Sequence, residues 1–565
     1  MCGIAGIVGP LSNPQTITAM LKSQAHRGPD NEGHWNVDTE ISLGHNRLSI
    51  LDLSEAANQP FHFSDGRYVM VFNGEIYNYL EIRQRLATKY SFRTQSDSEV
   101  LLYAFIESGL ECLHELNGMF AFAIWDKKEK KLSAARDRFG VKPFHYALWQ
   151  GSFLFSSEIN PIWAAGFPKK TKDSVWAGFF TKGTYGSPEE TFWEGIHQLP
   201  AGHTLEWKAG KSSIQPWYDF VKNVNSQPEI KPEEQSEYIL WLLKDAVSLR
   251  FRSDVPVGFN LSGGLDSSTL LALVSVLFPD KEQIEAFTFV TGDDRYDEVH
   301  WVKEMLKGRP YPLNTCLLTP EEVPSLTQKI SHLQSEPFGG IPTLAYSKVF
   351  QSARQKGILV LLDGQGSDEA WAGYDYYLNK SDSVVQGVKS SPVKPEALIK
   401  DFSGKYTHTP YPSLFSDPLL NLQYRDLFYT KIPRALRFND RVSMAHGTEL
   451  REPFLDYRLV EYVFSRPTDF KIKDGNQKWL LRQLAKTYLG DQIALAPKRP
   501  LQTPQREWLG GELTDWVDAQ LHTLVSKSNW FDSKTVFRLW EDYKKGDQDN
   551  SFYLWQWINA AELLK

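Results

Sequence analysis

The second residue of the chain is a cysteine, in the stretch MCGIAGIVG, and its position gives it an unusual chemical option. Removal of Met1 would leave Cys2 with both a thiol and a free α-amine. An α-amine has a pKa of about 7.7–8.0, so it can act as the general base for the thiol of its own residue. A cysteine at this position can also be incidental, and the remaining motifs decide between the two readings.

A second stretch, LSGGLDSS (261–268), has the composition of a phosphate-binding loop. It follows a strand-like run and opens a helical run, and its small residues let backbone N–H groups surround an anion. It lacks the Gly-Lys-Ser/Thr ending of a Walker A loop. Without a ligand it would be an ordinary glycine-rich turn between a strand and a helix.

Charged residues near this loop fit nucleotide chemistry. Asp266 in the loop and Asp368 in DGQGSDEAWAGY (363–374) are hard oxygen ligands suited to Mg²⁺ that bridges phosphates. Lys498, in APKRPLQTP (496–504), could stabilise negative charge on an α-phosphate. The alternative for Lys498 is a solvated basic loop.

The secondary structure that must position these residues is predicted to differ between the first and the second part of the chain. Up to about residue 210, short β-type runs bounded by Gly, Asn and Asp predict an α+β domain of layered antiparallel sheets. From about residue 237, buried strands alternate with helices, which predicts a doubly wound parallel α/β sheet with a more helical C-terminal part. We therefore expect domains at 1–212 and 237–565, joined by a polar linker at 213–236.

Composition excludes several classes of function. The net charge of −7 argues against nucleic-acid binding, and the chain has no apolar run long enough for a membrane span. The start of the sequence has no signal-peptide pattern, so we expect a cytoplasmic protein. Three widely spaced cysteines fit neither a disulfide framework nor a CxxC zinc site, and Cys112 and Cys316 are expected to be buried apolar residues.

Seven motifs in the first part of the chain resemble one family. MCGIAGIVG, AHRGPDNEG, GHNRLSILD, VFNGEIYNY, TQSDSEV, NGMFAFAIWD and ARDRFGVKPFHY occur in this order. Together they resemble the class II glutamine amidotransferase domain, an N-terminal-nucleophile (Ntn) fold, over roughly residues 2–160. The resemblance implies that Cys2 attacks the side-chain amide of glutamine, forms a thioester and releases ammonia.

The residue types in these motifs fit that reaction. Asn73 and the backbone N–H of Gly74 can donate to a tetrahedral oxyanion. The guanidinium of Arg47 suits the α-carboxylate of glutamine, and Asp97 suits its α-ammonium group. By the resemblance, the pocket is completed by Leu48, Ser49, Ile50, Leu51 and Glu75.

The second half extends the resemblance. The loop 261–268 is similar to that of ATP pyrophosphatases, and its succession with DGQGSDE, REPFLD and PK resembles the glutamine-hydrolysing asparagine synthetase family along nearly the whole chain. This implies that ATP with Mg²⁺ converts aspartate to β-aspartyl-AMP and that ammonia reaches it through an intramolecular tunnel. Relatives are often dimers. The implied ATP contacts are Leu261, Ser262, Gly263, Gly264, Asp266, Ser267, Ser268, Phe289, Asp363 and Gly364.

One position departs from the family pattern. The sequence reads DGQGSDE where relatives commonly read SGEGSDE, so Gln365 stands in place of a catalytic glutamate. The acceptor could therefore be a carboxylate other than aspartate, such as a sugar uronic acid, and the aromatic-rich segment 374–430 could shape a pocket for it. A non-catalytic regulatory relative is a further alternative, which the intact Cys2, Asn73, Asp97 and SGGLDSS disfavour.

Overall fold

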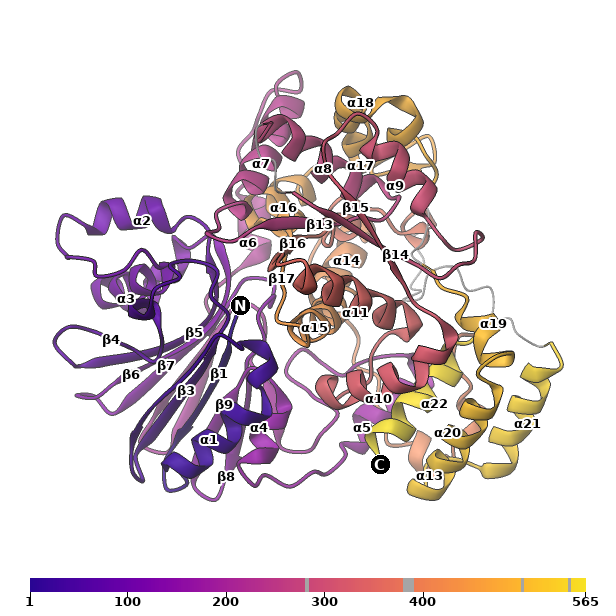
Figure 1. Cartoon of the computed structure of the whole chain (residues 1–565), viewed down its shortest axis with the longest axis horizontal. Coiled ribbons are helices and arrows are strands. Elements are labelled where there is room, and N and C mark those ends of the chain that lie inside the picture. Colours follow the sequence, from indigo (N-terminus) through magenta and orange to yellow (C-terminus); the bar gives the residue numbers. More distant parts are fainter. Residues whose placement is uncertain (280–283, 380–390, 499–501, 547–549) are drawn as a thin grey trace.

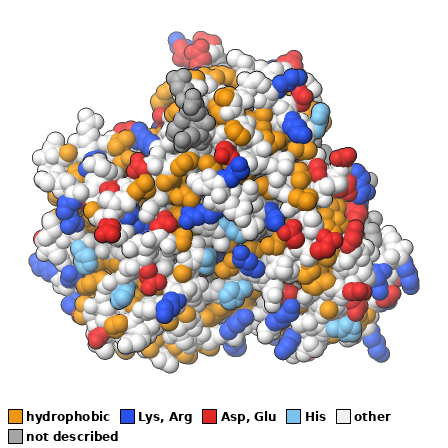
Figure 2. All heavy atoms as spheres, in the orientation of Figure 1, with side chains coloured by type: hydrophobic (Ala, Val, Ile, Leu, Met, Phe, Trp, Pro, Cys, Tyr) orange, Lys and Arg blue, Asp and Glu red, His pale blue; other side chains and the backbone are white. Residues whose placement is uncertain are grey.

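The computed structural model describes residues 1–279, 284–379, 391–498, 502–546 and 550–565. Parts of the aromatic-rich segment 374–430 and of the stretch 496–504 fall outside these ranges. Within them, no helix combines the length and the apolar character needed to cross a bilayer. Acidic and basic side chains are intermingled on the face drawn in Figure 2.

The N-terminal part contains two six-stranded antiparallel sheets, as the sequence predicts. The order in the first sheet is β10 (Ile196–Gln198), β8 (His145–Trp149), β9 (Ser152–Ser156), β1 (Gly3–Val8), β3 (Ile41–Arg47) and β2 (Asn31–Val37). The order in the second is β12 (Lys211–Pro216), β11 (His203–Lys208), β7 (Lys131–Arg136), β6 (Gly118–Asp126), β5 (Tyr68–Ile76) and β4 (Phe61–His62).

Apolar side chains of both sheets form one buried cluster, to which β1 contributes Ile4 and Val8 and β5 contributes Val69 and Val71. The outer faces are covered by helices: α1 (Pro14–Ser23) and α4 (Ile159–Ala164) lie against the first sheet, and α2 (Tyr79–Leu86) and α3 (Asp97–Ser108) lie against the second (Figure 1). The strand that begins with the third residue is thus central in its sheet and fully buried.

The C-terminal part is built on a five-stranded parallel sheet, which confirms the predicted doubly wound architecture. The strand order is β15 (Leu313–Leu317), β14 (Ala286–Val290), β13 (Val257–Asn260), β16 (Val360–Leu362) and β17 (Glu449–Arg451). Two separate apolar clusters cover the two faces of this sheet. One contains α7 (Gln235–Arg250), α8 (Leu265–Leu277) and α9 (Val299–Leu306), and the other contains α10 (Val323–Gln334) and α11 (Gly340–Gln355).

Helices dominate the rest of the chain, as expected. They are α12 (Ser367–Ala370), α13 (Lys400–Ser403), α14 (Pro418–Arg425), α15 (Ile432–Met444), α16 (Tyr457–Phe464), α17 (Thr468–Lys471), α18 (Trp479–Ala494), α19 (Gln505–Gly510), α20 (Thr514–Lys527), α21 (Ser533–Lys544) and α22 (Phe552–Leu563). A two-stranded hairpin, β18 (Ile472–Lys473) and β19 (Asn476–Gln477), precedes α18.

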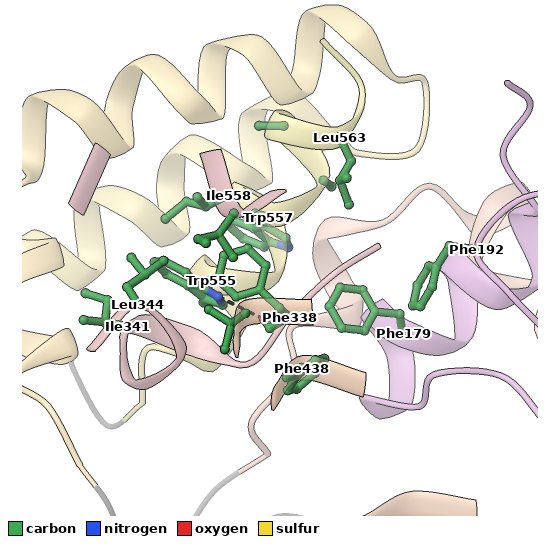
Figure 3. Packing of buried hydrophobic residues seen from close by; sticks show 14 of the residues in the cluster. Phe179, Phe192, Phe338, Ile341, Leu344, Phe438, Trp555, Trp557, Ile558 and Leu563 are labelled. Atoms are coloured by element: carbon green, nitrogen blue, oxygen red, sulfur yellow. Dashed lines mark hydrogen bonds between the residues drawn. The ribbon is translucent and has the colours of Figure 1, made fainter. Parts of the chain in front are cut away.

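The segment between the two sheet systems is more ordered than a simple connection. The expected linker at 213–236 contains the end of β12, the short helix α6 (Phe220–Asn225) and the first two residues of α7. The helix α5 (Asp173–Lys182), which precedes it, packs against the C-terminal helix α22 (Figures 1 and 3). The two parts of the chain therefore share an apolar cluster as well as a covalent connection.

Candidate functional site

The thiol lies at the start of the central strand β1, against β5 of the other sheet. The backbone N–H of Cys2 donates a hydrogen bond to Asn73 Oδ1 at 2.9 Å, and the carbonyl of Cys2 accepts one from Arg27 Nε at 3.1 Å. The Cys2 sulfur is 3.9 Å from the carbonyl oxygen of Leu48. Asn73 Nδ2 is buried and has no hydrogen-bond partner among the described residues. A free amide donor is thus held next to the thiol.

A small cavity surrounds this thiol and gathers most of the predicted glutamine-site residues. Ser49 is not on its wall; its backbone N–H donates to Asp30 Oδ2 at 2.8 Å. Asn73 reaches the thiol through its bond to the backbone of Cys2. The predicted residues that line the cavity are Cys2, Arg47, Leu48, Ile50, Leu51, Gly74, Glu75 and Asp97.

Close packing explains the glycine in the NGE motif. A Cβ atom at Gly74 would come within 2.2 Å of the backbone oxygen of Met119 on the neighbouring strand β6. No side chain fits there without moving the strand, so Gly74 is required for the approach of β5 to β6.

The two charged residues predicted to hold glutamine are both buried in the cavity wall. Arg47 Nη1 donates to Ser54 O at 2.8 Å and Asn58 Oδ1 at 2.7 Å, so it also holds the loop after β3. Asp97, at the first turn of α3, accepts the N–H of Ile76 at 2.8 Å. Burial raises the pKa of Asp97 to about 6, against the hydrogen bond from Ile76. Burial also raises the pKa of the Cys2 thiol.

Charged residues of the C-terminal part pair with two residues of the cavity wall, Met1 and Glu75, which the sequence did not predict. The Met1 α-ammonium group is buried and forms an ion pair of 2.7 Å with Glu449 on β17. Arg451, on the same strand, pairs with Glu449 at 2.6 Å and with Glu75 at 3.4 Å. Figure 1 shows the chain start between the two sheet systems, beside β17. The stretch that carries these residues, 441–456, was recognised only as a family motif.

A second, larger cavity of about 600 Å³ opens at the carboxyl ends of β13 and β16. Ligands of parallel α/β sheets bind at this edge. Leu261, Ser268 and Phe289 do not line this cavity. The predicted residues that do are Ser262, Gly263, Gly264, Asp266, Ser267, Asp363, Gly364, Gln365, Asp368 and Lys498.

Two lysines bind the acidic pair in this cavity. Lys478 Nζ lies 2.6 Å from Asp266 Oδ2 and 2.7 Å from Asp368 Oδ1, and Lys498 Nζ lies 2.8 Å from the same oxygen of Asp368. Burial acts to raise the pKa of Asp368, but the two ammonium groups hold it well below its usual range. Lys478 has no motif around it, and only its position between β19 and α18 brings it here.

Asp363 and Gln365 follow β16 and turn the chain at the cavity floor. Asp363 accepts hydrogen bonds from Asn260 Nδ2 at 2.7 Å and from the N–H of Gln365 at 3.0 Å. Burial raises the pKa of Asp363 to about 6. The side chain of Gln365 lines the cavity, so the position that departs from the family pattern faces the site.

A third, small cavity lies where the two sheet systems meet. Its wall includes Asn117, Met119 and Arg138 from the N-terminal part and Glu452 and Leu455 from the C-terminal part. Burial raises the pKa of Glu452 to about 8.

Comparison with known proteins matches each of the two parts of the chain to a known domain. The family model described as "Glutamine amidotransferase domain" matches residues 1–218, and the one described as "Asparagine synthase" matches residues 239–565. Asparagine synthetase (glutamine-hydrolyzing) 3 of Bacillus subtilis is 30% identical over 93% of this chain and 92% of that protein. Asparagine synthetase (glutamine-hydrolyzing) 1 of the same organism is 28% identical, covering 98% and 95%. Amidase chry2 of Gibberella zeae is 27% identical, covering 94% and 92%. The chain belongs to the glutamine-hydrolysing asparagine synthetase family, a family of ATP-dependent ligases.

Proposed function

We propose that this protein transfers ammonia from glutamine to a carboxylic acid that it first activates with ATP, and that the acid is aspartate. The observation that carries the proposal is the buried thiol of Cys2 beside the unpartnered Nδ2 of Asn73. An amide donor without a partner is costly to bury unless something binds to it. A developing oxyanion next to the sulfur meets that need.

In the glutaminase step, removal of Met1 frees the α-amine of Cys2, which takes the proton of the thiol. The sulfur attacks the amide carbon of glutamine, and the negative charge on its oxygen is held by Asn73 Nδ2 and the N–H of Gly74. The α-ammonium group of Cys2 then returns the proton to the leaving nitrogen; as the intermediate collapses, the C–N bond breaks, ammonia is released and a thioester remains. Water then cleaves the thioester and glutamate leaves.

Two charged side chains orient the glutamine. Asp97 binds its α-ammonium group, and Arg47 binds its α-carboxylate. The raised pKa of Asp97 means that its carboxylate is available above about pH 6. The pocket is completed by Leu48, Ile50, Leu51 and Glu75.

In the synthetase step, the loop from Ser262 to Ser267 and the start of α8 bind the phosphates of ATP. A carboxylate oxygen of the acceptor attacks the α-phosphorus, and pyrophosphate leaves. Lys498 stabilises the negative charge that builds on the α-phosphate. Ammonia then attacks the acyl carbon, and the bond to AMP breaks, which yields the amide.

The acidic pair fits a magnesium ion. Asp266 Oδ1 is buried and has no hydrogen-bond partner among the residues that the structure describes, and Lys478 already holds a positive charge between Asp266 and Asp368. Within the described ranges no third acidic, histidine or cysteine side chain joins them, so ATP phosphates would supply the other oxygen ligands. Bound there, Mg²⁺ would neutralise the charge of the pyrophosphate leaving group.

The third cavity supports a direct passage for ammonia between the sites. Both parts of the chain line it. Its lining residue Met119 also lies against Gly74, which lines the cavity around Cys2, called the glutaminase cavity here. Ammonia released into bulk water would mostly be protonated and lose its nucleophilicity. The cytoplasmic location and the homodimer expected from the sequence stay predictions, and light scattering tests the second.

ATP–pyrophosphate exchange tests the acceptor. Exchange that depends on aspartate supports the proposal, and exchange with a uronic acid but not with aspartate refutes it. The second candidate, amidation of another acid, is favoured by Gln365 and by the similarity to a protein named as an amidase.

A further inference from the structure

Two positively charged side chains in the second cavity, which is the proposed ATP site and is called the ATP cavity here, have no ion-pair partner among the described residues. Lys431, just before α15, and Arg434, on its first turn, both line the cavity. Lys431 is only 8% exposed. Among the residues that the structure describes, neither side chain forms an ion pair, and their recorded contacts are with tyrosine rings. A buried cation without a partner is costly, and an anionic ligand would remove that cost.

The other cations on the cavity wall do have partners. Lys478 and Lys498 are paired with the acidic residues described above. Arg482 donates to the carbonyl oxygens of Ala494 and Ala496, at 2.8 Å each. Of the described cations that line the cavity, Lys431 and Arg434 are therefore the two that remain for a ligand other than the metal and the phosphates.

The carboxylates nearest to Lys431 are engaged by other groups. Asp426 accepts hydrogen bonds from the hydroxyls of Tyr376 at 2.7 Å and Tyr377 at 2.8 Å, and it pairs with Arg425 at 3.0 Å. Glu369 accepts the hydroxyl of Tyr374 at 2.6 Å. Burial and the nearby charge of Arg434 lower the pKa of Lys431 to about 7, although Asp426 and Glu369 act to raise it.

The position of Tyr374 relates Lys431 to the reacting end of the acceptor. The Nζ of Lys431 lies 4.7 Å from the centre of this ring, and the Nζ of Lys498 lies 4.6 Å from the same centre. The two ammonium groups are therefore less than about 10 Å apart. An acid whose reacting carboxylate lies at Lys498 can place a second negative group at Lys431.

Aromatic side chains form another part of the described cavity wall. Figure 3 shows Phe179, Phe338, Phe438 and Trp555 directed toward one another at the place where α5, α15 and α22 meet, and these residues line the cavity. Arg434 lies over the ring of Tyr185, 5.6 Å from its centre. Among the described lining residues in this part of the cavity, the aromatic side chains offer packing, and Lys431 and Arg434 offer positive charge.

We infer that the acceptor acid carries a second anionic group and that Lys431 and Arg434 bind it, which makes these two residues the specificity determinants of the acceptor subsite. The inference rests on the proposed function. The α-carboxylate of aspartate is one such group, and the phosphate of a sugar acid phosphate is another.

The test is ATP–pyrophosphate exchange on the full-length enzyme with two matched pairs of acids. Aspartate is compared with 3-aminopropanoate, which lacks only the α-carboxylate, and glucuronic acid 1-phosphate with glucuronic acid. Charge-assisted hydrogen bonds predict a roughly 10- to 100-fold higher kcat/KM for the doubly anionic member of the pair that is used. The pair that responds identifies the source of the anion.

Substitutions test whether Lys431 and Arg434 cause the preference for the doubly anionic acid. Lys431→Met and Arg434→Met should each raise the KM of the doubly anionic acid about 10-fold or more, with little change for its partner acid or for ATP. Lys431→Arg should retain the preference. Lys473→Met, which removes an exposed lysine away from the cavity, is the control for net charge.

Three results would overturn the inference: equal kcat/KM within both pairs, an unchanged acceptor KM in Lys431→Met, or a rise in the KM of ATP instead. A wild-type enzyme that uses the singly charged acids equally well refutes the inference and leaves the amidotransferase proposal standing. A wild-type enzyme that supports exchange with none of the four acids refutes both.

Discussion

Replacement of Asn73 separates two contacts of one side chain. Its Oδ1 holds the backbone N–H of Cys2 at 2.9 Å, and its buried Nδ2 is free to bind an oxyanion. Asn73→Asp keeps the acceptor and loses the donor, whereas Asn73→Ala loses both. Loss of one oxyanion donor lowers kcat by about 10²–10³-fold, or ~2.7–4 kcal/mol in the transition state. Both variants should show this loss in glutamine hydrolysis, measured as glutamate release.

Protein stability distinguishes the two variants. Asn73→Ala leaves the buried N–H of Cys2 without a partner, which should cost about 1–3 kcal/mol of unfolding free energy, while Asn73→Asp keeps that bond. Asn78→Ala is the matched control, since Asn78 lies outside the glutaminase cavity and bonds to Glu115 O. Ammonia-dependent synthesis should persist in all three. If Asn73→Asp hydrolyses glutamine within threefold of the wild-type rate, the oxyanion role is wrong.

Three further predictions concern the remaining groups. Cys2→Ala should abolish glutamine hydrolysis and leave ammonia-dependent synthesis intact; residual glutaminase activity would contradict the assignment of the nucleophile. Because the pKa of Asp97 is raised to about 6, its carboxylate is lost as the pH falls through that value. The KM of glutamine should therefore rise below about pH 6 and level off above it, and in Asp97→Asn it should be high throughout. Lys498→Met should lower ATP–pyrophosphate exchange by about 100-fold or more with glutaminase activity retained; a parallel loss of both activities would indicate a structural role.

The architecture was largely predictable because local patterns agree with it. The alternating runs in the first half became antiparallel strands, and the continuous apolar run KGILVLLDG became a central parallel strand, β16. The linker was less predictable: its polar composition hid the helix α6, whose Phe220 and Val224 are buried against the C-terminal part. The overall composition of the segment is polar, but two apolar residues one helical turn apart, Phe220 and Val224, are sufficient to pack α6 against the C-terminal part.

The candidate sites were predictable where a motif carries its own geometry. The loop 261–268 and the NGE stretch are local, so their residues reach the cavities together. Lys431 and Lys478 were missed because no local sequence pattern distinguishes them from the other lysines. Only the fold brings Lys431 beside Tyr374 and Lys478 beside Asp368. The motif around Arg451 was recognised, but it does not reveal the ion pairs of Glu449 and Arg451, since their partners Met1 and Glu75 lie more than 370 positions away in the sequence.

A buried ion pair connects the two parts of the chain directly beside Cys2. Arg27, which holds the carbonyl of Cys2, pairs with Glu158 at 2.8 Å in its own half and with Asp440 at 2.9 Å on α15. Removal of one partner from such a buried pair costs about 3–5 kcal/mol, because it leaves an uncompensated charge. The first turn of α15 carries Arg434 into the ATP cavity, and its third turn carries Asp440 to Arg27. One helix therefore contacts the acceptor subsite at one end and, through a single arginine, the backbone of the nucleophile at the other.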